Sequence, residues 1–335
     1  MPGLSVSVVI PTYNRAHLLQ RALDSALEQT RDGDEVIVVD DGSTDGTPEL
    51  LEEYADRIRV VRGERAGGAA ARNRGTRAAR CDLVAFLDSD DEWFPGKLDM
   101  QREVLEKRRD VLFVFGEFAS TLADGTPQRR HLWNWHRDPR SWNDIVPNPV
   151  DFSSIGELPE GVDDFAVHIG DMFPQMAHRL YVLTSSYIAR RIETGDALHY
   201  DEDLEIYEDW GCFSRVAQLG PGAFLDTELA WQHGHDGDRI SDARDLARST
   251  CHLILLDRIY EGDAEYRSRH AGEYDALREG LRERRAADLI FVGRLSDARA
   301  ELSRMKSPPF SFRVLAHLPA PLVGVILDLR RRLRG

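Results

Sequence analysis

Short apolar runs rich in β-branched residues alternate with helical patterns over the first ninety residues, and this alternation constrains the fold more than any other feature. The runs occupy residues 4–11, 36–39, 58–63 and 83–87. Strands that alternate with helices form right-handed βαβ units and a parallel sheet. We therefore predict an α/β fold with a mostly parallel central sheet flanked by helices.

Polar residues follow three of these four runs. The sequence reads TYNR after the first run, DDGS after the second and DSDD after the fourth. Ligands bind at the carboxyl ends of the strands in such sheets, so we expect these segments to converge on one binding rim. A dinucleotide-binding fold is not expected, because the end of the first run, IPTYNRAHLL, lacks the G-x-G-x-x-G turn.

The aspartates of the DSDD segment raise a question of charge. Asp88, Asp90 and Asp91 would repel one another and raise one another's pKa values if they were unpaired. A divalent cation removes this conflict, and carboxylate oxygens suit Mg²⁺ or Mn²⁺, which share open positions with substrate phosphates. The alternative is a solvated acidic turn that caps the next helix. The neighbouring strand end, also acidic at Asp40 and Asp41, favours the metal.

The composition argues against several classes of protein. The net charge of −15 over 335 residues disfavours a nucleic-acid binder. The sequence contains no run of 18 apolar residues, so we expect no membrane-spanning helix. The N-terminus lacks the basic region and cleavage site of a signal peptide. Cys81, Cys212 and Cys251 are far apart and odd in number, which is typical of reduced core thiols in a cytosolic protein rather than of a metal or disulfide framework.

The periodicity fades between residues 118 and 178. This segment contains Trp133, Trp135 and Trp142 among several prolines. The tryptophans could form a platform for sugar stacking or could simply pack a long loop. The segment is too long for an ordinary connection, so it is either functional or built from short elements.

Regular patterns return after this segment. Residues 178–191 are strand-like, and residues 207–220 have the spacing of a helix that ends at Gly220. From about residue 242 onward the chain looks helical and rich in Arg and Glu.

Five motifs, taken in order, resemble glycosyltransferase family 2, the inverting GT-A-fold enzymes that use nucleotide sugars. The motifs are VSVVIPTYNR, VIVVDDGSTDGT, ARNRG, AFLDSDDEW and YEDWGCFSRVAQLG. The resemblance covers residues 4–241. It implies a nucleotide-sugar-binding half at residues 1–117, an acceptor-binding half at residues 118–241 and, outside the resemblance, a helical C-terminal extension at residues 242–335.

The resemblance also implies a donor site. Asp41 would accept a hydrogen bond from the nucleotide base, Arg72 would lie near the sugar or diphosphate, and Asp88 would contact the ribose. Asp41 could otherwise be a turn residue, and Arg72 a surface cation. The expected donor-site residues are Pro11, Thr12, Tyr13, Arg15, Asp41, Arg72, Asp88 and Ser89.

A metal site and a catalytic base follow from the same resemblance. Asp90 would ligate Mn²⁺ or Mg²⁺ together with Asp88 and a late histidine. In WQHGHDGDRIS the spacing to Ser241 favours His235 over His233, although either could be a surface residue.

The motif YEDW supplies the expected general base. Asp209 would take the proton of the acceptor hydroxyl, and Glu208 could share the role. The alternative is that these carboxylates only complement the dipole at the helix N-terminus.

The expected activity is transfer of a sugar from a nucleotide-diphosphate sugar, with UDP favoured, to a hydroxyl of a growing glycan or lipid-linked acceptor. Such acceptors belong to cell-surface polysaccharide synthesis or glycoprotein glycosylation. Two alternatives are a catalytically silent nucleotide-sugar-binding homologue, which would lack the D-x-D motif or the base, and a nucleotidyltransferase. The latter would need a Gly-rich, Lys-containing loop after the first strand, and PTYNRAH has none.

The C-terminus suggests a location. Leu322, Val325, Ile326, Leu329 and Leu333 repeat at helical spacing, next to four arginines. Such a segment can lie on an anionic membrane surface or dock on protein. We expect a cytoplasmic protein with peripheral contact at the inner face of the membrane.

Overall fold

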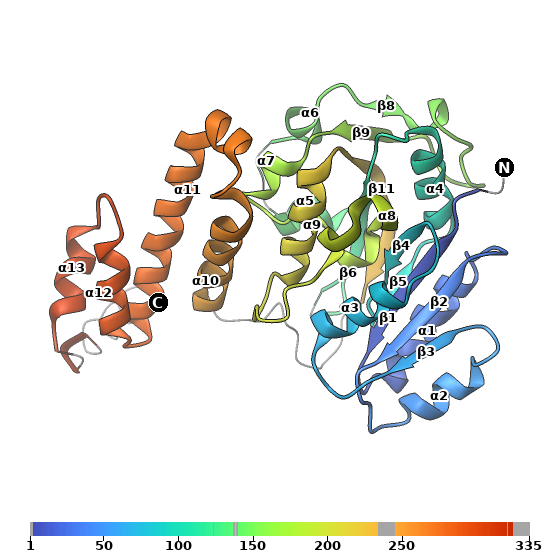
Figure 1. The fold of residues 1–335 in the computed structure, drawn as a ribbon, viewed down its shortest axis with the longest axis horizontal. Coiled ribbons are helices and arrows are strands. Elements are labelled where there is room, and N and C mark those ends of the chain that lie inside the picture. The colour runs from blue at the N-terminus through green and yellow to red at the C-terminus, as the bar shows by residue number, and fades with distance from the viewer. Residues whose placement is uncertain are drawn as a thin grey trace. The chain divides into compact units, whose positions relative to one another are not determined.

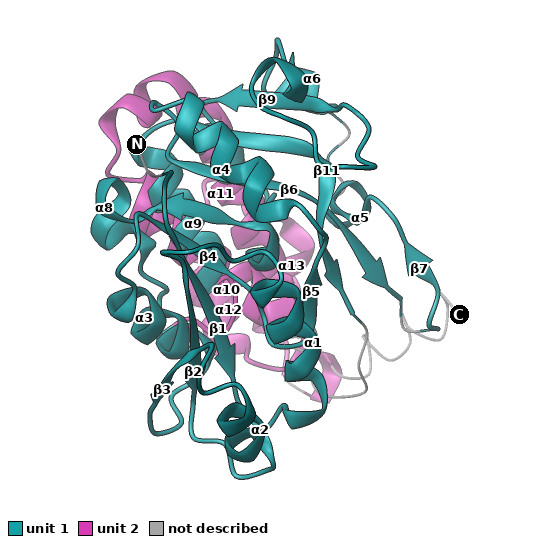
Figure 2. Ribbon diagram, turned by 90° about the vertical axis from the view of Figure 1, so that its right-hand side faces the viewer, with its two compact units in different colours: residues 1–203, 208–237 teal, residues 204–207, 238–335 magenta. Residues whose placement is uncertain are grey.

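The computed structural model describes residues 3–122, 124–136, 138, 140–233, 245–319 and 321–323. The chain divides into two compact units (Figure 2). Unit 1 contains residues 1–203 and 208–237, and unit 2 contains residues 204–207 and 238–335. Cys81, Cys212 and Cys251 are all buried and carry free thiols.

Unit 1 is built on one sheet of eleven strands (Figure 1). The order along the sheet is β3-β2-β1-β4-β10-β6-β11-β9-β8, and β5 and β7 pair with β11 and β6. The strands are β1 (Val6–Thr12), β2 (Glu35–Asp40), β3 (Arg59–Arg62), β4 (Leu83–Phe86), β5 (Asp91–Trp93), β6 (Phe113–Thr121), β7 (Pro127–Gln128), β8 (Val150–Asp151), β9 (Ala166–Gly170), β10 (Ile188–Arg190) and β11 (Gly222–Gln232).

Helices cover both faces of this sheet. They are α1 (Ala16–Leu27), α2 (Thr47–Glu53), α3 (Gly68–Ala78), α4 (Lys97–Lys107), α5 (His131–His136), α6 (Trp142–Ile145), α7 (Phe173–Met176), α8 (Arg191–Thr194) and α9 (Glu208–Leu219), with short 3₁₀ turns at Phe152–Ser154, Thr184–Ser186 and Gly195–Leu198.

The direction of the first four strands decides which helix lies on which face. β1 pairs in parallel with β2 on one side and with β4 on the other. Right-handed crossovers therefore put α1 and α2 on one face, and α3, which returns from β3 to β4, on the opposite face (Figure 2). The chain reverses its winding at β1 and β4, so the crevice at their carboxyl ends is the expected binding site.

Residue size explains how closely α3 approaches the sheet. This helix has the small-residue sequence GAAARNRGTRA. A Cβ added to Gly75 would lie 2.3 Å from Cγ1 of Val9 and 3.1 Å from Cγ2 of Val39. Only glycine permits this contact, which brings Arg72, one turn earlier, against the end of the sheet.

The second half of the sheet differs from expectation in two ways. Residues 178–191 form only the short strand β10, which is antiparallel to β4 and β6 and follows the 3₁₀ turn at Thr184–Ser186. The eleven-residue strand β11, which the sequence pattern did not reveal, pairs with β5, β6 and β9. The pairing of β11 with β6 shifts register at residues 226–228. These three residues are polar and break the apolar alternation by which a strand is recognised in the sequence.

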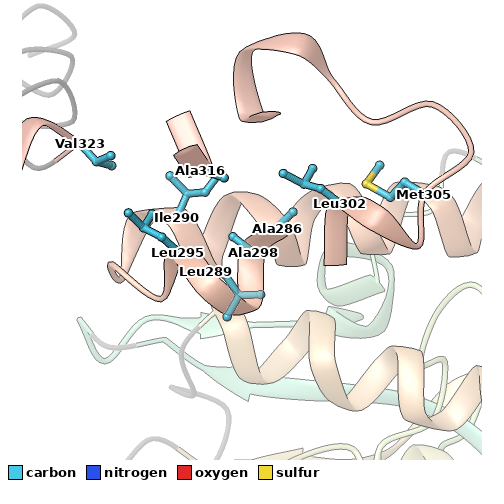
Figure 3. Close-up of a cluster of buried hydrophobic side chains, with 9 residues drawn as sticks. All are labelled: Ala286, Leu289, Ile290, Leu295, Ala298, Leu302, Met305, Ala316 and Val323. Carbon is cyan, nitrogen blue, oxygen red and sulfur yellow. The ribbon is translucent and has the colours of Figure 1, made fainter. Parts of the chain in front are cut away.

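Unit 2 is helical, as the sequence predicted for the chain beyond residue 242. Its helices are α10 (Asp245–Leu255), α11 (Ala264–Phe291), α12 (Leu295–Ser303) and α13 (Phe310–His317), with a π-helical turn at Leu256–Tyr260. A small apolar core joins α11, α12 and α13 around Leu289, Ala298 and Ala316 (Figure 3). Inside it the buried Glu301 accepts a hydrogen bond from Arg285 at 2.6 Å. No helix in the described part of the chain is both long and apolar enough to cross a bilayer.

Candidate active site

The loops that follow β1 and β2 are tied to each other. The Asn14 backbone N–H donates to Oγ of Ser43 at 2.9 Å, and the Asn14 side-chain oxygen accepts the N–H of Thr44 at 2.7 Å. Asn14 has a positive φ of 51°, a conformation that Asn tolerates better than most residues. These contacts fix the TYNR and DDGS segments side by side at the predicted rim.

The predicted base-binding residues lie at this rim. Pro11 is buried within β1, opposite Val39 of β2. Thr12 ends the strand, and its buried hydroxyl oxygen lacks a hydrogen-bond partner among the described residues. The guanidinium of Arg65 lies over the ring of Tyr13, 4.3 Å from the ring centroid. The Arg15 backbone N–H donates to Oγ1 of Thr47 at 3.1 Å.

Asp41 anchors the loop that precedes α3. Its carboxylate accepts the backbone N–H of Ala66 at 3.0 Å and that of Gly67 at 2.7 Å, and it pairs with Nη1 of Arg74 at 2.8 Å. Gly67 has a φ of 96°, which glycine adopts without strain. Asp41 therefore has a structural role, and its predicted contact with a base would be additional to these internal contacts.

Arg72 connects two acidic segments that are far apart in the sequence. Its Nη2 lies 2.6 Å from Oδ1 of Asp88, and its Nη1 lies 3.3 Å from Oε1 of Glu208. The ring of Tyr200 lies 5.4 Å from the guanidinium. Burial disfavours the charge of Arg72, but Asp88, Tyr200 and Glu208 together raise its pKa above the ordinary value. Arg72 is thus a buried cation that brings the D-x-D and YEDW motifs to one place.

The DSDD segment forms the turn from β4 to β5. Asp88 and Ser89 follow β4, and the Asp88 backbone N–H donates to Oγ of Ser185 at 3.1 Å. Arg21 donates to the backbone carbonyl of Asp90 at 2.9 Å. These contacts hold the turn in place and leave roughly a quarter of the Asp88 side chain exposed at the rim.

Asp91 differs from the two preceding aspartates because it begins β5 and is buried. The hydroxyl of Ser185 donates to its carboxylate. Burial, followed by the charges of Asp90 and Asp88, raises the pKa of Asp91 well above its ordinary range. Asp88 and Asp90 are therefore better suited than Asp91 to act as anionic metal ligands.

The metal chemistry can be tested against these residues. Among the residues that the structure describes, no three acidic, histidine or cysteine side chains are grouped to hold a metal ion. Asp88 and Asp90 offer two carboxylates, a set that Mg²⁺ or Mn²⁺ completes with water and substrate phosphates. Two carboxylates would need ligands from water and from a substrate to complete a cation site, since Asp88 is also paired with Arg72.

Of the two histidines proposed for the metal site, the structure describes only His233. His235 lies outside the described residues. His233 directly follows β11, and its Nε2 lies 2.9 Å from Oε2 of Glu92. Its ring stacks on Trp231 with 5.3 Å between centroids. Burial lowers the pKa of His233, although its hydrogen bond with Glu92 opposes the shift.

Asp209 lies in the first turn of α9. Its Oδ1 accepts the N–H of Trp210 at 2.7 Å, and its Oδ2 accepts a hydrogen bond from Thr184 at 3.4 Å. The Trp210 indole donates to the carbonyl of Met176 at 2.6 Å, which fixes the start of the helix. Burial raises the pKa of Asp209 to about 7; repulsion by Glu208 adds to the shift and Arg72 opposes it. A carboxylate with this pKa is suited to exchange a proton near neutral pH.

The sequence did not single out several residues that shape this site. Thr184 contacts Asp209, Ser185 holds both Asp88 and Asp91, and Tyr200 covers Arg72. Thr184 and Ser185 belong to residues 178–191, which the sequence pattern predicts to be a strand. The run of three polar residues in TSS was the one sign that this segment leaves the sheet.

Comparison with known proteins shows which family and which relatives the chain is similar to. The model of glycosyl transferase family 2 matches residues 7–156. A Bacillus subtilis protein named for teichuronic acid biosynthesis, glycosyltransferase TuaG, is 41% identical over 126 residues, which are 36% of this chain and 50% of that protein. The Escherichia coli UDP-Glc:alpha-D-GlcNAc-diphosphoundecaprenol beta-1,3-glucosyltransferase WfgD is 39% identical over 120 residues, 35% of this chain and 47% of that protein. The chain thus matches about half the length of each.

A solved structure extends the comparison over most of the fold. S. aureus TarS (residues 1–349), in complex with UDP-GlcNAc, superposes with a TM-score of 0.56 at 18% identity and covers 89% of this chain and 88% of that one. The predicted α/β GT-A fold with a helical extension, and the resemblance to family 2, are confirmed.

Proposed function

We propose that this chain, which matches glycosyltransferase family 2 over residues 7–156, transfers a sugar from a nucleotide-diphosphate sugar to an acceptor hydroxyl with inversion at the anomeric carbon. The observation that carries the proposal is the pair of contacts made by Arg72, which unite Asp88 with the helix start that bears Asp209. The donor diphosphate and the base would then face the same reacting carbon.

Each group has a role in a single displacement. Asp209 accepts the proton as the acceptor hydroxyl attacks, since it is only partly buried and its pKa is near neutrality. Asp88 and Asp90 would hold Mg²⁺ or Mn²⁺, which would neutralise charge on the departing diphosphate when bound. Arg72 is a fixed positive charge next to Asp88 and supports the same charge separation.

We propose that the nucleotide is UDP. The tethered TYNR and DDGS loops provide a preformed floor for a base, and the relatives are named for UDP-glucose or were solved with UDP-GlcNAc. A thermal-shift panel of UDP, GDP and ADP with and without Mn²⁺ tests this choice, because a ligand of the native state raises its stability. Equal shifts for the three nucleotides would contradict it.

We propose that the acceptor is a lipid-linked or growing cell-surface glycan. Two relatives are named for such chemistry. A transfer assay with UDP-sugars and a diphosphate-linked lipid acceptor tests the activity, and NMR of the fresh product gives the anomeric configuration. A retained configuration would contradict the single displacement. Binding of the donor without any transfer would favour the silent homologue.

We further propose that the C-terminal segment touches an anionic membrane surface. In α13, Phe310 and Val314 lie one turn apart and are both exposed, next to Arg313. Arg330, Arg331, Arg332 and Arg334, and the predicted apolar positions from Val325 to Leu333, lie outside the described residues. Changing these four arginines to glutamine should abolish sedimentation with phosphatidylglycerol vesicles and leave donor binding intact. Unchanged sedimentation would contradict the proposal.

A further inference from the structure

A pocket lies in unit 1, between the strands of the second half of the sheet and the helices α5 and α6. It has a volume of about 300 Å³. This is the lower end of the range for small-ligand sites, so it suits one sugar ring better than a nucleotide. Its wall combines aromatic and hydrogen-bonding side chains, chiefly Glu117, Arg130, Trp133, Trp142, Asn143 and Asp226.

The three tryptophans of this region have different surroundings. Trp133 and Trp142 line the pocket, whereas Trp135 does not. Trp142 is buried and stacks on Phe224 with 3.8 Å between ring centroids, so its orientation is fixed. Trp133 is 37% exposed and Trp135 is 38% exposed, and Trp135 packs edge-on against Phe118. Equal exposure with different placement makes Trp135 a matched reference for Trp133.

The polar groups of the pocket are built into the fold. Glu117 is almost fully buried in β6, and its Oε2 accepts the backbone N–H of Leu132 at 3.1 Å. Asp226 lies where the pairing of β11 with β6 shifts register, and such irregularities re-aim side chains. Arg130 forms an ion pair with Asp226. The pocket wall thus combines two carboxyl groups with Arg130 and His168, so it offers hydrogen-bond acceptors as well as donors.

The pocket is connected to the candidate active site through a short stretch of chain. Trp142 packs edge-on against Tyr181 with 5.7 Å between centroids. Tyr181 precedes Thr184, the partner of Asp209, by three residues, which span at most about 11 Å. A glycan of a few rings can therefore reach from one place to the other.

We infer that this pocket binds a neutral pyranose ring of the acceptor glycan, with Trp133 as the stacking surface and Glu117 and Asp226 as acceptors for sugar hydroxyls. The inference rests on the proposed glycosyltransferase function for the identity of the larger ligand. Burial raises the pKa of Glu117 to about 7, because its surroundings disfavour a negative charge. The same surroundings favour a neutral ligand over an anionic one. A charged sugar such as a uronic acid would have to compete with Asp226 for Arg130.

The test uses the full chain without donor and a panel of methyl glycosides of glucose, galactose, N-acetylglucosamine and glucuronate. Saturation-transfer NMR and tryptophan fluorescence should detect at least one neutral glycoside. Trp133→Ala should weaken that binding by about tenfold or more, Trp133→Phe should largely restore it, and Trp135→Ala should leave it unchanged. Circular dichroism of each variant checks the fold.

Several outcomes would overturn the inference. They are no binding of any neutral glycoside, preferred binding of glucuronate, or equal losses in Trp133→Ala and Trp135→Ala. Because donor is absent, the result is independent of turnover, so failure of the proposed function is seen separately in the transfer assay. If transfer is observed, Trp133→Ala should raise the acceptor KM about tenfold and leave the donor KM unchanged.

Discussion

Nη2 of Arg72 lies 2.6 Å from Oδ1 of Asp88, and this ion pair is largely removed from water. The same guanidinium reaches Glu208, 136 residues further along the chain. The pair therefore does more than neutralise a carboxylate. It fixes the distance between the acidic turn after β4 and the start of α9, where the two halves of the proposed chemistry meet.

Removing this cation should destabilise the fold. Arg72→Met leaves the buried Glu208 and the partly exposed Asp88 without their countercharge, which costs up to about 3–5 kcal/mol. Arg108→Met removes the exposed pair with Asp110 and should cost less than about 1 kcal/mol. Urea unfolding of both variants measures the difference. Similar losses would mean that the Arg72 contacts are energetically equivalent to a surface pair.

Asp209 should give the reaction an acidic limb. A general base works when it is deprotonated, and burial raises the pKa of Asp209 to about 7. Turnover should therefore rise with pH through about 7 and level off above it. Asp209→Asn should lose about 10²–10⁴-fold in kcat and also lose this limb, with nucleotide affinity little changed. A variant with near-normal turnover would place the base elsewhere.

Glu208→Gln should shift the same limb in a known direction. The negative charge of Glu208 raises the pKa of Asp209, and Arg72 lowers it. The amide removes the repulsion and leaves Arg72 in place, so the pKa of Asp209 should fall and the limb should move to lower pH. The pH dependence of kcat measures the shift. Movement to higher pH would contradict the charge arrangement described for this site.

Asp90→Asn tests the metal proposal. The variant should lose the Mn²⁺-dependent part of its nucleotide affinity and nearly all turnover, because the amide is a weaker ligand for a hard cation. Asp110→Asn, at an exposed ion pair, is the control and should bind like the unmodified protein. Titration calorimetry with UDP, with and without Mn²⁺, gives the comparison. Unchanged metal-dependent binding in Asp90→Asn would rule out this ligand.

Asp41→Ala separates a structural role from recognition of the base. The substitution removes the acceptor for the N–H groups of Ala66 and Gly67 and the partner of Arg74. We expect a loss of about 1–3 kcal/mol in stability, the range for hydrogen bonds to a charged group, and faster proteolysis near residues 64–67. If the variant keeps its stability and loses only nucleotide affinity, Asp41 serves the ligand alone.

The sequence determined the first part of the fold and the location of its chemistry. The strands end where the apolar runs end, and TYNR, DDGS and DSDD all follow parallel strands whose direction is set by right-handed crossovers. Local pattern suffices there, because a strand buried on both faces must be apolar throughout and its polar continuation must lie at an edge.

Tertiary structure decided the rest, because contacts between distant residues and the loss of water leave no local signal. The shift in register within β11 breaks the alternation by which a strand is recognised in sequence. The TSS segment has a strand-like pattern, and only the hydrogen bond between Ser185 and Asp88 shows that it forms a turn at the site. The high pKa of Asp209 comes from burial and from the negative charge of Glu208, and the positive charge of Arg72 opposes it. A sequence motif can name a carboxylate, but only the surrounding fold sets the dielectric and the neighbours that determine when it carries a proton.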